Sequence, residues 1–151
     1  MNALLALPAV QTYAIASALL VVLLYGLGFY TAKRRNDTKK VMNKEDVAIN
    51  GGAEVVEVEH PDVLRIQRAH RNSLENAVPF FVLGLLFALT GPSATLAAAL
   101  MYGFVTVRVL HTIFYLAAKQ PFRTASFAVG ALINLAMAGL IVYSLVAPAR
   151  P

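Results

Sequence analysis

A polar stripe within residues 65–81, "RIQRAHRNSLENAVPFF", holds the first side chains whose spacing could support chemistry. Arg68, Arg71, Asn72 and Glu75 follow the spacing i, i+3, i+4 and i+7, which places them on one face of a helix. Guanidinium groups bind carboxylates through paired hydrogen bonds, and a carboxylate can accept a hydrogen bond from an ammonium group. The stripe therefore suits a small zwitterion with an excess of carboxylates. It suits a metal ion poorly, because the arginines would repel a cation.

A second polar stripe lies further along the chain, where Arg108, His111 and Tyr115 have the spacing i, i+3 and i+7. Both stripes interrupt apolar runs, and a charge at the centre of a bilayer costs at least about 2.5–3.5 kcal/mol. Such groups usually pair with one another or line a wet cavity. We therefore expect a polar pocket between the two helices, open to the cytoplasmic face.

Four apolar segments must position these stripes. The chain has 151 residues, of which 58% are hydrophobic and only 14% charged, whereas about a quarter of the residues are charged in soluble domains. A helix of roughly 20 residues crosses a hydrocarbon core of about 30 Å. Segments of sufficient length occupy residues 10–31, 62–89, 94–118 and 122–146. The sequence therefore predicts an all-α integral membrane protein, a single domain built as a four-helix transmembrane bundle.

The basic residues predict the orientation of this bundle. "KRRNDTKK" at 33–40 follows the first segment, and Lys119 and Arg123 flank the turn before the fourth. The positive-inside rule then places the loop at 33–60 and that turn in the cytoplasm. Within the loop, "INGGAEVVEVEH" at 49–60 is expected to form an ordered excursion. Pro61 and Pro121 stand where helices are expected to start.

Composition excludes several classes of function. The chain has no cysteine, so it has no disulfide framework, thiolate metal site or cysteine nucleophile. Its formal net charge is +5, but the basic residues lie beside apolar runs. We therefore expect contact with membrane lipid and no nucleic-acid partner.

Each polar residue also has a structural interpretation. Arg65 would be a snorkelling side chain at the membrane interface, and Tyr115 would belong to an interfacial aromatic belt. Arg108 would pair with Glu75 of the neighbouring helix, and Arg123 would be an ordinary positive-inside anchor.

The last apolar segment carries a separate pattern. Ser126, Gly130, Asn134 and Ala138 recur every four residues, and small residues at that spacing let transmembrane helices approach closely. We expect tight helix packing along this stripe, within or between subunits. Asn134 is expected to hydrogen-bond to a neighbouring helix.

Several stretches resemble the MAPEG family, the membrane-associated proteins of eicosanoid and glutathione metabolism. They follow one another in the family's order and are "NKEDVAINGG" (43–52), "PDVLRIQRAHRNSLENAVPF" (61–80), "RVLHTIFYL" (108–116) and "PFRTASF" (121–127). The resemblance implies a homotrimer of four-helix subunits. It also implies that glutathione binds as cosubstrate between adjacent subunits, near the cytoplasmic side.

The resemblance also assigns the site residues. Arg123 would stabilise the glutathione thiolate, with Thr124 as a hydroxyl donor, and Arg35 would come from the neighbouring subunit. The residues implied to hold glutathione are Arg35, Gln67, Arg68, Arg71, Asn72, Glu75, His111, Tyr115 and Arg123.

The resulting hypothesis is a glutathione transferase that acts on lipophilic electrophiles and reduces lipid hydroperoxides. The prostaglandin synthase branch of the family has serine at Thr124 and tyrosine at Phe127, so "RTASF" and "LEN" favour the transferase branch. A prostaglandin-type isomerase remains an alternative, although Asp46, which aligns with an aspartate implicated in isomerisation, is poor evidence.

Two further alternatives are not enzymes. One is a lipid-binding or scaffold protein of the same fold, whose polar residues would be structural. The other is a small exporter, which ranks last because the first segment has no embedded acid. The short loops favour a bacterial inner membrane, with the endoplasmic reticulum as the eukaryotic counterpart.

Overall fold

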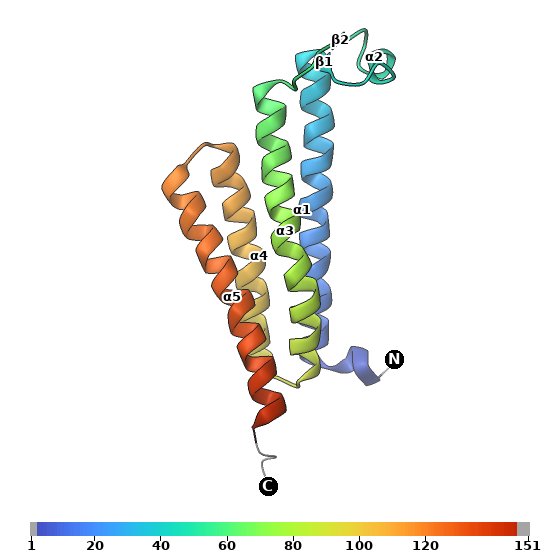
Figure 1. The fold of residues 1–151 in the computed structure, drawn as a ribbon. Coiled ribbons are helices and arrows are strands. Elements are labelled where there is room, and N and C mark those ends of the chain that lie inside the picture. The colour runs from blue at the N-terminus through green and yellow to red at the C-terminus, as the bar shows by residue number, and fades with distance from the viewer. Residues whose placement is uncertain (1–2, 148–151) are drawn as a thin grey trace.

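The computed structural model describes residues 3–147, which form a bundle dominated by four long helices (Figure 1). After a short 3-10 turn, η1 (Ala3–Ala6), these helices are α1 (Pro8–Thr38), α3 (Pro61–Leu89), α4 (Ala94–Leu116) and α5 (Gln120–Val146). All four are long and apolar enough to cross a membrane. The predicted all-α bundle of four apolar helices is therefore confirmed.

Helix α1 continues beyond the apolar run into residues that we expected in the loop. Lys33 pairs with Asp37 at 2.9 Å, one helical turn later, and Arg34 lies 3.7 Å from the same carboxylate. The hydroxyl of Thr38 donates to the carbonyl of Arg34 at 2.9 Å, and Lys39 ends the helix with a φ of 52°. These local ion pairs favour a helical end for the basic segment.

The long loop after α1 is ordered, as expected. It contains β1 (Lys40–Val41), the single turn α2 (Asp46–Ile49) and β2 (Glu54–Val55). The two strands pair in parallel, with Lys40 opposite Glu54 and Val41 opposite Val55. Figure 1 shows this small unit beyond the ends of α1 and α3.

The remaining helices begin at residues suited to helix starts. Pro61 and Pro121 lie in the first turns of α3 and α5, as predicted. The hydroxyl of Ser93 accepts a hydrogen bond from the amide of Leu96 at 3.3 Å and caps α4. Between α3 and α4, Gly91 adopts a φ of +70°, which suits glycine.

The hydrophobic core is formed by residues from all four long helices. At its centre, the rings of Phe80 and Phe104 stack with centroids 4.6 Å apart and planes 7° from parallel. Around them lie buried residues that include Ala16, Leu20, Phe87, Met101 and Met137. These contacts fix the rotation of each helix and thereby decide which polar side chains meet.

The small-residue stripe of α5 packs against other helices of the same chain. Ser126, Gly130 and Asn134 are buried, and the side-chain amide of Asn134 donates to the carbonyl of Asn76 on α3 at 3.5 Å. The predicted hydrogen bond from Asn134 to a neighbouring helix is confirmed.

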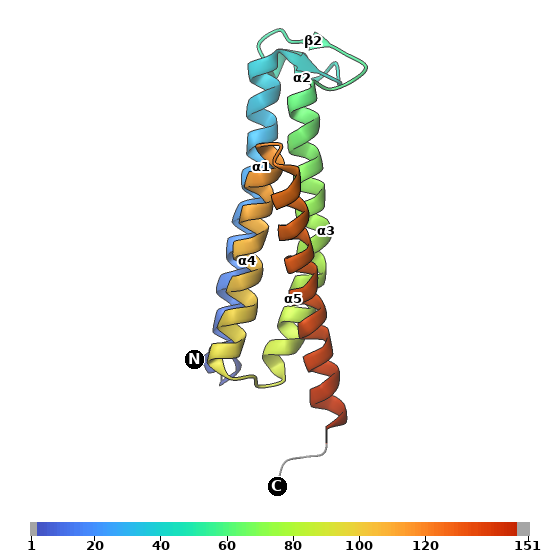
Figure 2. The same ribbon diagram turned by 90° about the vertical axis from the view of Figure 1, so that its left-hand side faces the viewer.

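The connections are segregated between the two ends of the bundle. The α1–α3 loop and the α4–α5 turn lie at one end, and the N-terminal turn and the α3–α4 turn lie at the other (Figures 1 and 2). Helices α1 and α3 extend beyond the α4–α5 turn at the loop end. The basic residues of the loop and of the turn before α5 are therefore at the same end.

Candidate functional site

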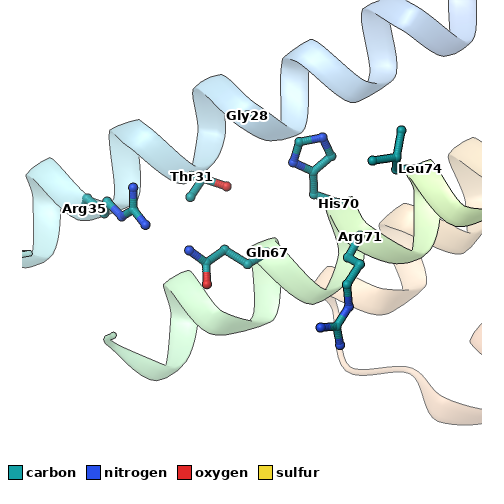
Figure 3. A pocket seen from close by; sticks show the side chains of 7 residues that line it. All are labelled: Gly28, Thr31, Arg35, Gln67, His70, Arg71 and Leu74. Atoms are coloured by element: carbon teal, nitrogen blue, oxygen red, sulfur yellow. The ribbon is translucent and has the colours of Figure 1, made fainter. Parts of the chain in front are cut away.

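The first concave surface lies between α1 and α3 and is called the α1–α3 groove. Its volume is about 360 Å³, and its lining residues are Gly28, Thr31, Arg35, Gln67, His70, Arg71 and Leu74. Figure 3 shows the first three on α1 and the other four on α3. Arg35, Gln67 and Arg71 belong to the predicted glutathione set.

The α1–α3 groove adjoins an apolar hollow of about 510 Å³. The two share Gly28, His70 and Leu74, and the hollow is otherwise lined by Val21, Leu24 and Tyr25. A polar end and an apolar end therefore meet along one groove.

The second concave surface lies between α3, α4 and α5 and is called the α3–α5 groove. It consists of two hollows that share Tyr115 and Arg123. One hollow, of about 270 Å³, is also lined by Pro61, Arg65 and Arg68. The other, of about 330 Å³, is also lined by Asn72, His111, Thr124 and Phe127.

Arg123 stands at the centre of the α3–α5 groove. Its guanidinium carbon lies 4.6 Å from the centroid of the Tyr115 ring, which is a cation–π distance. Within residues 3–147 it forms no ion pair with a carboxylate. Thr124, the next residue of α5, lines the same hollow. The groove thus presents a half-buried cation, held by an aromatic ring, beside a hydroxyl group.

Arg108 takes a structural position behind this groove. It is only 1% exposed, and its Nη2 donates to the side-chain oxygen of Asn72 at 2.8 Å and lies 3.4 Å from His111 Nδ1. The expected pairing of Arg108 with Glu75 is therefore wrong. Glu75 lies 3.9 Å from Arg71, and its side chain is 62% exposed. Asn72 therefore faces α4, whereas Glu75 lies on the exposed side of α3.

The predicted glutathione-binding and catalytic residues do not line a single pocket between the second and third apolar segments in the described part of the chain. Those that line the α1–α3 groove are Arg35, Gln67 and Arg71. Those that line the α3–α5 groove are Arg68, Asn72, His111, Tyr115, Arg123 and Thr124. Helix α3 forms the ridge between them. The stripe covers a wide arc of α3, and α1 packs on one part of that arc while α4 and α5 pack on another.

Two acidic residues of the loop, Asp46 and Glu59, lie outside both grooves, and only Glu59 contacts a groove residue. Asp46 accepts a hydrogen bond from the Asn43 amide at 3.2 Å in the loop and lines neither groove. Glu59, which the sequence analysis did not identify, is 3% exposed and accepts a hydrogen bond from Arg35 Nε at 2.6 Å. No motif or periodicity marks Glu59, because only the folded loop brings it back to α1.

Comparison with known proteins assigns this chain to a family. The model of the MAPEG family matches residues 13–143. The chain belongs to the MAPEG family. This membership and the four apolar helices make it an integral membrane protein, and the family resemblance of the sequence motifs is confirmed.

Two kinds of MAPEG protein are similar to this chain. Human "Microsomal glutathione S-transferase 1" is 42% identical over 112 residues, which cover 72% of each chain. Human "Prostaglandin E synthase" is 33% identical over 132 residues, which cover 87% of this chain and 86% of the relative. The horse protein of that name is 33% identical over 136 residues, covering 89% and 88% respectively.

Proposed function

We propose that this MAPEG protein is a glutathione transferase that conjugates glutathione to lipophilic electrophiles in the membrane and also reduces lipid hydroperoxides. The observation that carries the proposal is Arg123, a guanidinium without a carboxylate partner in residues 3–147, stacked on Tyr115 beside Thr124. The similarity to human microsomal glutathione S-transferase 1 supports the same activity.

The charges of the two grooves match those of glutathione. Glutathione has two carboxylates, one ammonium group and one thiol. Arg68 and Arg71 have guanidinium nitrogens exposed for the carboxylates, and Glu75 is exposed enough to accept from the ammonium group. Arg35, Gln67, Asn72, His111 and Tyr115 complete the proposed binding set.

Arg123 would activate the thiol by electrostatics. A free thiol has a pKa of about 8.5, so little thiolate exists at neutral pH. A guanidinium beside the sulfur favours the charged form and lowers that pKa. Stacking on Tyr115 favours a position of Arg123 within the groove, and the Thr124 hydroxyl adds a hydrogen-bond donor for the sulfur.

Two reactions follow from a thiolate in this groove. With an aryl halide, the sulfur attacks the ring carbon, the C–S bond forms and halide departs with the bonding electrons. With a lipid hydroperoxide, the sulfur attacks the terminal oxygen, the S–O bond forms and the O–O bond breaks. The departing alkoxide takes a proton from solvent, which balances the proton released when the thiol ionised. The sulfenic acid then condenses with a second glutathione to give the disulfide and water.

We also propose a homotrimer whose subunit contacts complete the site. The Arg71 side chain is 74% exposed on a membrane-spanning helix, where lipid contact with a charge is costly. A neighbouring subunit would cover it and bring its own α1–α3 groove against the α3–α5 groove. Arg35 would then be supplied to the neighbour's site. The site would face the cytoplasm, with a bacterial inner membrane favoured over the endoplasmic reticulum.

Substitution of Arg123 tests the proposed chemistry. In detergent-purified protein at saturating glutathione, Arg123→Ala should lower turnover of an aryl halide by at least about tenfold at pH 7, because the thiol pKa returns toward its ordinary value. Arg123→Lys, which keeps the charge, should retain more activity. Ultraviolet absorbance of bound thiolate should be present near neutral pH in the wild type and lost in Arg123→Ala. Undiminished turnover in Arg123→Ala would exclude the assigned role.

A second candidate function is isomerisation of a prostaglandin endoperoxide. The similarity to prostaglandin E synthases, which extends over most of the chain, favours it. Phe127 argues against it, because this residue lines the α3–α5 groove and has no hydroxyl where that branch has tyrosine. Incubation with the endoperoxide and analysis of the products separates the two activities.

A scaffold role would be indicated by calorimetry that detects no glutathione binding.

A further inference from the structure

Glu59 is a buried carboxylate at the loop end of the bundle. Its side chain is 1% exposed, although it lies in the connection just before α3. One oxygen, Oε1, accepts from Arg35 Nε at 2.6 Å and also pairs with Arg35 Nη2. The other oxygen, Oε2, is buried and has no hydrogen-bond partner among residues 3–147. Arg35 is therefore the group that neutralises this carboxylate.

Burying the Glu59 carboxylate costs free energy of folding, so the pair with Arg35 calls for a physical explanation. Removing a carboxylate from water is expensive, and a buried ion pair often stabilises a fold less than apolar residues of the same size would. Conformational specificity is a recognised reason for retaining such a pair.

The pair determines where the Arg35 guanidinium lies. Arg35 is on the last turns of α1, where a long side chain has many accessible rotamers. Nε and Nη2, the two nitrogens of one edge, both contact Glu59, which fixes the orientation of the guanidinium. Nη1 has no hydrogen-bond partner among residues 3–147. The same residue lines the α1–α3 groove with Gln67 and Arg71 (Figure 3).

The loop in turn fixes Glu59. The amide of Glu54 donates to the carbonyl of Lys39 at 2.9 Å, and the amide of Val56 donates to the carbonyl of Val41 at 2.8 Å. These bonds fasten the returning chain to the end of α1, three residues before Glu59. The pairing of β1 with β2 thus sets the position from which Glu59 reaches Arg35.

We propose that Glu59 is a positioning residue for glutathione binding: its buried carboxylate holds the Arg35 guanidinium at the α1–α3 groove, ready for a carboxylate of glutathione. This inference rests on the proposed function. Glu59 itself lines neither groove and would not touch glutathione.

Glu59→Gln tests the role, because glutamine keeps the shape and removes the charge that orients Arg35. The KM for glutathione should rise about fivefold, the cost of part of a charge-assisted hydrogen bond, while kcat at saturating glutathione stays unchanged. Glu57→Gln is the matched control, since Glu57 is an exposed acid two residues earlier and should leave both parameters unchanged. An unchanged KM in Glu59→Gln would overturn the proposal.

A double-mutant cycle with Arg35→Ala shows whether Glu59 acts through Arg35. Arg35→Ala leaves a buried carboxylate unpaired, so its unfolding temperature in detergent should fall, and adding Glu59→Gln should restore part of that loss. In the Arg35→Ala background, Glu59→Gln should not raise KM further. A further rise in KM there would mean that Glu59 acts independently of Arg35, against the proposal.

The two hypotheses fail in different ways. A folded wild-type protein that neither binds nor conjugates glutathione would overturn the proposed function and this role together. A wild type that binds glutathione, combined with a Glu59→Gln variant of normal KM, would overturn the positioning role alone.

Discussion

At the residue scale, buried Arg108 positions two residues of the α3–α5 groove, although burying its charge does not favour folding. Its guanidinium lies inside the bundle, and two of its nitrogens, Nε and Nη1, have no hydrogen-bond partner within the described chain. The third, Nη2, contacts the Asn72 oxygens and lies beside His111. Both of these residues line the α3–α5 groove. Arg108 therefore holds two lining residues in place at a cost to the fold.

Replacing Arg108 by methionine should separate these two effects. Arg108→Met keeps much of the buried volume and removes an incompletely paired charge, so the unfolding temperature in detergent should stay equal or rise. Asn72 and His111 lose their common contact, so the KM for glutathione should rise about tenfold, which corresponds to roughly 1.4 kcal/mol. Thermal unfolding and steady-state kinetics measure the two outcomes.

The control for this variant is Val109→Met, because Val109 is the neighbouring residue on α4 and its side chain is partly exposed to the surroundings. It should leave both quantities nearly unchanged. A large fall in the unfolding temperature of Arg108→Met would contradict the argument, since it would show that Arg108 stabilises the fold.

At the scale of elements, α1 and α3 pack closely at Gly84, away from the α1–α3 groove. Gly84 lets the two helices approach, because a Cβ added there would lie 3.1 Å from Tyr13 Cδ2. Tyr13 has little freedom to move, since its hydroxyl donates to the Phe81 carbonyl at 2.9 Å and its ring stacks on Phe80. The close approach is thus determined by a small residue on one helix and a restrained ring on the other.

Gly84→Ala should therefore destabilise the bundle even though alanine favours helices. Overpacking of this kind typically costs about 1–3 kcal/mol, which exceeds the gain in helix propensity of about 1 kcal/mol. Gly139→Ala is the matched control, because a Cβ at Gly139 meets nothing within 4 Å. Comparison of unfolding temperatures in detergent decides the matter. Equal stability of the two variants would mean that Tyr13 moves aside freely.

For the whole molecule, the division of the predicted set between two grooves has a consequence for assembly. Arg35 lies in the α1–α3 groove and Arg123 in the α3–α5 groove, with α3 between them. In a closed ring of identical subunits, one surface of each subunit meets a different surface of its neighbour. The proposed trimer would bring the α1–α3 groove of one subunit against the α3–α5 groove of the next. The proposed site would then need Arg35 from one subunit and Arg123 from the next.

Mixed oligomers test this arrangement. Arg35→Ala and Arg123→Ala should each show low conjugation at subsaturating glutathione. Coexpressed in equal amounts, they should recover about a quarter of the wild-type activity, because one site in four combines an intact Arg35 with an intact neighbouring Arg123. Cross-linking in detergent should give trimers. Activity of the mixture no higher than the mean of the single variants would indicate sites contained within one subunit.

Much of the fold could be predicted because the relevant signals are local. Apolar run length determined the four helices, and Pro61 and Pro121 marked two of their starts. The continuation of α1 to Thr38 was missed, because hydropathy locates an apolar run and does not locate a charged helix end. The sequence nevertheless contains the signal for this end, because Lys33 and Asp37 have the i, i+4 spacing of a helical ion pair.

The sequence by itself determined which residues are candidates, since the helical period identifies the two polar stripes and the family motifs add Arg123. Only the tertiary structure decided which of them meet. Arg108 contacts Asn72 instead of Glu75, and the stripe is shared between two grooves. Glu59 reaches Arg35 across a folded loop. These contacts depend on how packing rotates each helix and where the loop returns, and helical periodicity contains neither.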